Sequence, residues 1–228
     1  MTTERIADIQ ARIRNMHYRQ RTDSLDYHLI RARVRLLQDN STQGLLEAER
    51  AFKEQLAIKM RMQTVSAHYG LALIALQRKE PVKARQFLSL ARKEANDSQP
   101  YSKNATFAST SIDIHMAAGN VAEATKEANR ARQSFSLSRG FVYQYSDALI
   151  ASKRTNEATL YLRDQVQQYR SDAKLQRQLA KAYSAQGKRA LMHLALAEAY
   201  ELSGSLGSAL EQLSLARRAP DALSLIHI

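Results

Sequence analysis

Histidines are the residues of this chain best suited to binding a metal or moving a proton, but their spacing fits neither task. A zinc-binding helix needs two histidines four positions apart, with a glutamate after the first, so that both imidazoles reach one ion. The six histidines are scattered outside any such motif: His17, His28, His68, His115, His193 and His227. No cysteine is present that could act as ligand or nucleophile. We therefore predict no metal site and no bound cofactor in this chain.

Loops that could cradle a phosphate or present a nucleophilic serine are also missing from the sequence. It contains neither a Gly-x-Gly-x-x-Gly motif nor a Gly-Lys-Ser or Gly-Lys-Thr loop, and Gly187-Lys188 stands alone at an expected helix turn. The segment Gly204-Ser205-Leu206-Gly207 has neither the spacing of a nucleophile turn nor a strand before it. We expect no catalytic residue, and no site for a small-molecule substrate.

Noncovalent recognition is the chemistry that the remaining polar residues offer. Tyrosine supplies amphipathic contact area with little loss of entropy, and lysine and arginine hold acidic segments or a free carboxylate. We treat Leu71, Tyr145 and Leu179 as equivalent repeat positions, so residues two places before or after them should lie on an exposed inner face. The candidates for partner binding, with one cation added a turn earlier, are Tyr69, Tyr143, Asp147, Lys174, Arg177 and Lys181.

The elements that must position these residues are helices. The chain of 228 residues is 44% hydrophobic, with only 7 glycines and 3 prolines for turns. The abundant Ala, Leu, Gln, Arg, Lys and Glu lose little side-chain entropy in a helix. Periodic apolar segments and their breaks predict about twelve helices and an all-α fold.

A repeated motif predicts how the helices are arranged. Leu-Ala-x-x-Tyr-x-x-x-Gly occurs at 179–187 and again at 196–204, an offset of 17 positions. Ala124 and Ala158 are 34 positions apart, the length of a tetratricopeptide repeat. Small residues at such offsets let antiparallel helices approach closely. We predict a tetratricopeptide-repeat-like α-solenoid of about twelve antiparallel helices.

Three regions can be distinguished along the chain. Residues 1–63 should hold an entry helix and divergent opening helices, because none of them matches the repeat well. Residues 64–218 should hold the repeats. Residues 219–228 form a C-terminal stub that ends in the apolar run 223–228, with no evident repeat role.

The formal net charge of +12 raises the possibility of a nucleic-acid partner. The excess of cations is spread in near proportion to length, and the arginines between Arg12 and Arg35 fall on several helix faces. Such a distribution disfavours one basic stripe but leaves a nucleic-acid-binding helical repeat as the alternative. No stretch reaches the roughly 20 apolar residues of a membrane-spanning helix. The start at Met1–Ile6 has no apolar core of a secretory signal, so none is expected in this sequence.

Several segments resemble one family. They are 4–13 (ERIADIQARI), 23–29 (DSLDYHL) and the doubled pattern 179–218. Together they are similar to the C-terminal tetratricopeptide-repeat region of BepA-type (β-barrel assembly-enhancing) periplasmic zinc metalloproteases. The resemblance implies a Gram-negative periplasm. It also implies outer-membrane β-barrel proteins and their assembly machinery as partners, and contact with the family's own protease domain in a full-length chain.

The sequence departs from that family because the protease domain, with its zinc ligands, is absent. No catalytic role can therefore be transferred to a residue here. We expect a noncatalytic repeat domain that docks substrates or partners for a periplasmic metalloprotease or chaperone. A further interpretation is that the chain is a fragment of a metalloprotease. The enzymatic activity would then belong to the protease domain that this sequence lacks.

Overall fold

Every element in the described part of the chain is an α-helix. The computed structural model describes residues 3–14, 23–97 and 99–222. The helices are α1 (Thr3–Arg14), α2 (Leu25–Gln38), α3 (Thr42–Ile58), α4 (Arg61–Gln77), α5 (Pro81–Glu94), α6 (Ala105–Ala117), α7 (Val121–Ser134), α8 (Arg139–Ala151), α9 (Thr155–Gln168), α10 (Ala173–Ala185), α11 (Arg189–Leu202) and α12 (Leu206–Arg218). The prediction of an all-α fold with about twelve helices is confirmed. His17, His227 and the apolar run 223–228 lie outside the described residues.

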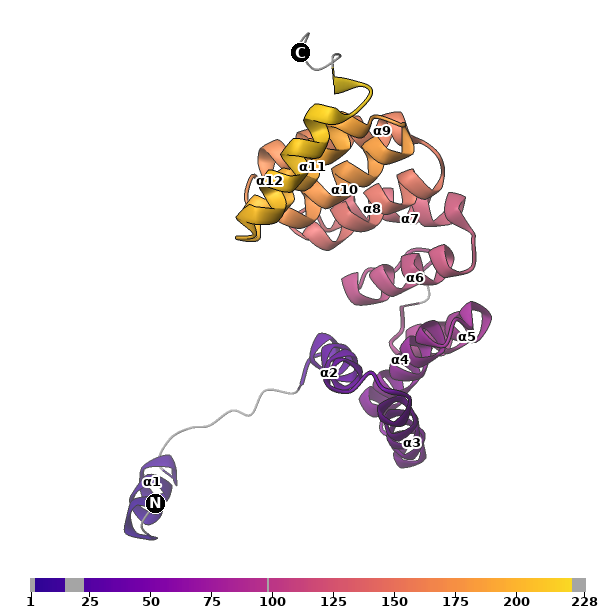
Figure 1. The fold of residues 1–228 in the computed structure, drawn as a ribbon. Helices are drawn as coiled ribbons and strands as arrows, with labels where there is room; N and C mark the ends of the chain where they lie inside the picture. The colour runs from indigo at the N-terminus through magenta and orange to yellow at the C-terminus, as the bar shows by residue number, and fades with distance from the viewer. Residues whose placement is uncertain (1–2, 15–22, 98, 223–228) are drawn as a thin grey trace.

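From α2 to α12 the helices pack in sequence order and form a solenoid (Figure 1). The even-numbered helices also contact one another in succession, α2 with α4, α4 with α6, α6 with α8 and α8 with α10. They form one row, and the odd-numbered helices between them form the other. Helix α1 stands apart from this array and contacts no other described helix (Figure 1).

The turns after α6, α8 and α10 share one backbone geometry. Gly119, Lys153 and Gly187, each 34 residues from the next, adopt positive φ angles of 74°, 61° and 72°. At each turn, the amide of the following residue bonds back to a carbonyl five positions before it in the preceding helix. This is a Schellman-type helix end, for which glycine is preferred because it has no Cβ. The 34-residue period predicted from the sequence is therefore visible in the backbone.

Two hydrophobic cores run through the solenoid. The N-terminal core joins α2, α3, α4 and α5, and the C-terminal core joins α7, α8, α9, α10 and part of α11. Helix α6 belongs to both, because Phe107 and Ile114 enter the N-terminal core while Ala108 and Ile112 enter the C-terminal core. Small side chains fill the places where helices approach closely, and these alanines are buried: Ala72, Ala84, Ala180, Ala197 and Ala209. The division between residues 1–63 and 64–218 stays a prediction, and its boundary falls inside α4.

Candidate functional site

The predicted partner-binding residues lie on three helices of the even-numbered row. Tyr69 comes from α4, Tyr143 and Asp147 from α8, and the three cations from α10. Because α8 contacts α10, the residues of these two helices are brought together, whereas α4 contacts neither helix. The structure thus gathers five of the six predicted residues and separates Tyr69 from them.

Tyr69 is fully buried, with 0% of its surface exposed, so the expectation that it lies on an open face is wrong. Its hydroxyl is 3.1 Å from Oγ1 of Thr110, which also accepts a hydrogen bond from Arg33 at 3.2 Å. Its ring packs edge to face against the ring of Phe107, with 5.9 Å between the two ring centroids. Two residues of helix turn the side chain by about 200°, and on α4 that rotation directs Tyr69 toward α6. Burial raises the pKa of its hydroxyl. Tyr69 is a packing residue in this structure.

Tyr143 lies at the junction of α8 and α10, half-buried. Its hydroxyl donates a 2.5 Å hydrogen bond to Oδ2 of Asp172, and Nζ of Lys174 lies 4.1 Å from the centre of its ring. Burial, and then the hydrogen bond to the Asp172 carboxylate, raises the pKa of Tyr143 to about 12. Its hydroxyl is therefore held by the fold, and what remains for a partner is part of the ring and the ammonium group above it.

Asp172 fixes the start of α10 and with it the positions of the cations. Its Oδ1 accepts hydrogen bonds from the amides of Lys174 and Leu175 at 3.0 and 3.3 Å, the usual arrangement of a helix N-cap. Oδ2 also pairs with Arg139 at 3.2 Å. Burial opposes ionisation, but the hydrogen bonds from Tyr143 and the two amides outweigh it and lower the pKa of Asp172. The carboxylate consequently stays charged and ties α8 to α10.

Three exposed cations follow one another along α10. Lys174, Arg177 and Lys181 are spaced by three and four residues, which places them on one face of the helix. Nζ of Lys181 lies 3.9 Å from Oδ1 of Asp147, and Arg177 donates a 2.8 Å hydrogen bond to Oγ of Ser203. Both of these contacts are solvent-exposed. Breaking them costs little free energy, so an acidic partner could replace them. We call Tyr143, Asp147, Lys174, Arg177 and Lys181 the α8–α10 face.

A carboxyl group on the neighbouring helix extends this polar row. Asp113 of α6 accepts a 2.7 Å hydrogen bond from Gln144 of α8. Burial raises the pKa of Asp113, the hydrogen bond from Gln144 opposes the shift, and Asp147 adds a small repulsion. The row therefore changes from acidic on α6 and α8 to basic on α10.

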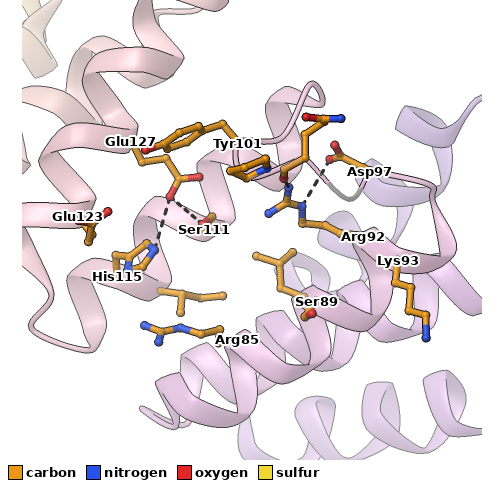
Figure 2. A pocket seen from close by; sticks show the side chains of 14 residues that line it. Arg85, Ser89, Arg92, Lys93, Asp97, Tyr101, Ser111, His115, Glu123 and Glu127 are labelled. Atoms are coloured by element: carbon orange, nitrogen blue, oxygen red, sulfur yellow. Dashed lines mark hydrogen bonds and ion pairs between the residues drawn. The ribbon is translucent and has the colours of Figure 1, made fainter.

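A second polar site, which the sequence had not indicated, lies between α5, α6 and α7 (Figure 2). The cavity has a volume of about 590 Å³. At its centre Ser111 donates a 2.8 Å hydrogen bond to Oε2 of Glu127, and Nε2 of His115 is 3.7 Å from the same oxygen. Glu127 is only 6% exposed, and burial raises its pKa. Burial lowers the pKa of His115, and the nearby Arg85 guanidinium lowers it further.

Arg92 makes the main polar contacts of the opposite wall of this cavity (Figure 2). Its guanidinium donates to the carbonyl of Gln99 and pairs with Asp97, with Nε 3.5 Å from Oδ2. Asp97 also accepts a hydrogen bond from Ser102, and Arg130 stacks 3.8 Å above the ring of Tyr101. These contacts hold the long connection between α5 and α6 against the cavity.

The order of groups in the cavity does not match nucleophilic catalysis. A catalytic serine gives its proton to an imidazole that a carboxylate orients from the far side. Here Glu127 stands between Ser111 and His115, so that the hydroxyl proton is directed at the carboxylate. Neither here nor elsewhere in residues 3–14, 23–97 and 99–222 do three His, Asp or Glu side chains lie close enough together to hold a metal ion. None of the described helices is long and apolar enough to cross a membrane.

No protein-family model and no curated protein matches this chain. The resemblance to BepA-type metalloproteases consequently remains a prediction from the sequence, as do the partners and compartment that it implies.

One sequence signal could have pointed to the second site. Ser111 and Ile112 stand where the repeat usually has a large and a small residue. A polar residue at a core position requires a partner, and His115 follows Ser111 by one helical turn. Nothing in the sequence, however, shows that Glu127 of the next helix supplies that partner.

Proposed function

We propose that this chain is a noncatalytic, tetratricopeptide-repeat-like domain that docks proteins on the α8–α10 face. In the reading that the sequence resemblance supports, it holds substrates or partners for a periplasmic metalloprotease or chaperone that acts in outer-membrane protein assembly and quality control. The observation that carries the docking proposal is the single-sided row Lys174, Arg177 and Lys181, exposed beside the partly buried Tyr143 ring.

The composition of this face suits a polypeptide partner. A tyrosine ring offers apolar area, and three cations can take up acidic side chains or a terminal carboxylate. Asp147 and Asp113 interrupt the basic character where α8 and α6 adjoin the cations. A nucleic-acid backbone favours an unbroken basic path, so these carboxyl groups count against it. A mixed row can instead match the alternating charges of an extended segment.

Binding of a fluorescently labelled, urea-unfolded outer-membrane β-barrel protein, measured by anisotropy after dilution of the urea, tests the proposal. Changing Lys174, Arg177 and Lys181 together to Ala should weaken binding about tenfold, because three exposed ion pairs of about 0.5 kcal/mol each are lost. A matched control changes Lys126, Arg163 and Lys188 to Ala. It removes the same net charge from exposed positions on α7, on α9 and just before α11, and this variant should bind like the unchanged chain.

The outcomes separate the readings. Equal weakening by both triple variants would show that net charge and not the α8–α10 face is responsible. Tighter binding of a labelled single-stranded RNA than of the unfolded β-barrel protein, with a steep dependence on salt, would favour the nucleic-acid alternative. Absence of binding to the unfolded protein would contradict the proposed role.

A further inference from the structure

Helix α2 is apolar on two opposite sides. Leu29, Ala32 and Leu36 are buried in the N-terminal core. The far side carries an exposed stripe at spacings of three, four and three residues, made of Tyr27, Ile30, Val34 and Leu37. We call these four residues the α2 stripe. A helix that is apolar on both sides is normally covered on both sides, whereas in this structure only one side of α2 is covered.

Helix α1 carries a stripe of the same kind and lacks a partner. Ile6, Ile9 and Ile13, at spacings of three and four residues, are 41%, 47% and 54% exposed. None of the residues of α1 is buried, and the helix contacts no other described helix. Its opposite side, with Glu4 and Asp8, is polar. An amphipathic helix of this type obtains its stability in a protein by burying its apolar stripe.

We propose that α1 docks in cis on the α2 stripe. In an antiparallel arrangement Ile13 faces Tyr27, Ile9 faces Ile30 and Val34, and Ile6 faces Val34 and Leu37. The stripes then match along their full length. Glu4 and Asp8 then point away from α2.

Charge supports the antiparallel direction. Arg12 and Arg14 lie in the last turn of α1, where Arg12 also pairs with Asp8 at 3.0 Å. Asp23 and Asp26 flank the beginning of α2, where they also contact His28 and Asn104. Antiparallel docking brings these two ends together, so that cations meet carboxylates. Parallel docking would instead bring the two arginines to the end of α2 that carries Arg35.

Chain length favours the same molecule over a second copy. Residues 15–24 connect the two helices, and ten residues reach at most about 33 Å, more than a hairpin of two packed helices requires. A short tether sets an effective concentration in the millimolar range. A second copy would have to approach that concentration to compete, so we assign the α2 stripe to the chain's own α1.

Disulfide trapping tests the docking without interference, because the chain has no native cysteine. The full chain carrying Ile6→Cys and Val34→Cys should oxidise to an intramolecular disulfide. A control with Ala7→Cys and Val34→Cys has nearly the same chain separation but places its thiol on another side of α1. We expect the first pair to close at least about tenfold faster than the second, because docking raises its effective concentration selectively.

Mass spectrometry and gels run without reductant distinguish disulfides within a monomer from disulfides between two chains. Three outcomes are possible. Selective closure within monomers supports docking of α1 in cis. Equal rates for the two pairs would mean that α1 is not held on α2 and would overturn the proposal. Predominant disulfide-linked dimers, increasing with protein concentration, would assign the stripe to a second copy and overturn docking in cis.

Discussion

At the scale of single residues, the most unusual group is the carboxyl of Glu127. Its 6% exposure removes most of the water that would stabilise a charge, and Ser111 supplies one hydrogen bond in return. His115, 3.7 Å away, would pair with it if protonated, but burial and Arg85 lower the pKa of that imidazole. The charge on Glu127 is therefore incompletely compensated at neutral pH.

This imbalance predicts a pH-dependent stability. Because burial raises the pKa of Glu127 above its ordinary value of 4.5, the folded state binds this proton more tightly than the unfolded state. Its contribution to the free energy of unfolding is greatest below pH 4.5 and is lost as pH rises through the raised pKa. Glu127→Gln should therefore stabilise the protein at neutral pH and lose that advantage below pH 4.5. Urea unfolding across this pH range measures the difference.

Glu211→Gln is the matched control, since it removes one negative charge from an exposed site on α12, outside this cavity. A stability gain at neutral pH of the same size in both variants would attribute the effect to net charge. A Glu127→Gln variant that is less stable than the original chain at every pH would show that the carboxylate is a net stabiliser.

For single residues, the sequence predicted on which helix face a side chain lies better than it predicted whether that side chain is buried. Lys174, Arg177 and Lys181 lie exposed on one helix face, as their spacing indicated. Tyr69 was chosen by the same spacing and is buried. The difference arises because α4 is covered by α2, α3, α5 and α6. Helical periodicity gives the direction of a side chain, but only the tertiary structure shows whether another helix lies there.

At the scale of elements, the 34-residue repeat is visible in the turns that follow α6, α8 and α10. The turn after α8 places Lys153 at φ 61°, where the equivalent turns after α6 and α10 have Gly119 and Gly187. A residue with a Cβ in this conformation costs roughly 1 to 2 kcal/mol. The fold tolerates the cost because the neighbouring amides complete the same hydrogen bonds to α8.

Lys153→Gly should consequently stabilise the protein by about 1 kcal/mol. The side chain is exposed, so its removal loses little packing. The midpoint of urea unfolding should rise without a change in slope. Lys126→Gly, in the interior of α7, provides the contrast and should destabilise by about 1 kcal/mol. If Lys153→Gly destabilises to a similar extent, strain at this turn is not significant.

The elements were largely predictable because their signals are local. Apolar spacing, Pro81 at the start of α5 and glycines at the turns mark helices without knowledge of the fold. What the periodicity of α2 could not show is which of its two apolar sides is covered by other helices. Leu29 is buried, whereas Val34 and Leu37 are exposed, although all three share one helical pattern.

At the scale of the whole molecule, α6 is the element that joins the two cores. Phe107 and Ile112 are both fully buried and only five residues apart, yet one belongs to the N-terminal core and the other to the C-terminal core. In a solenoid each unit is stabilised by its neighbours, so a loss at one interface spreads first to the adjacent units. Substitutions on this single helix can therefore test whether the cores unfold separately.

Phe107→Ala should cost about 3 to 5 kcal/mol and Ile112→Ala about 2 to 5 kcal/mol, each by leaving a cavity in one core. Native-state hydrogen exchange should show reduced protection chiefly in α4 and α5 for the first variant, and in α7 and α8 for the second, because those helices line the respective cavities. Each variant serves as the control for the other, since both truncate an apolar residue of α6. Equal loss of protection throughout both cores in both variants would mean that α6 couples them into one cooperative unit.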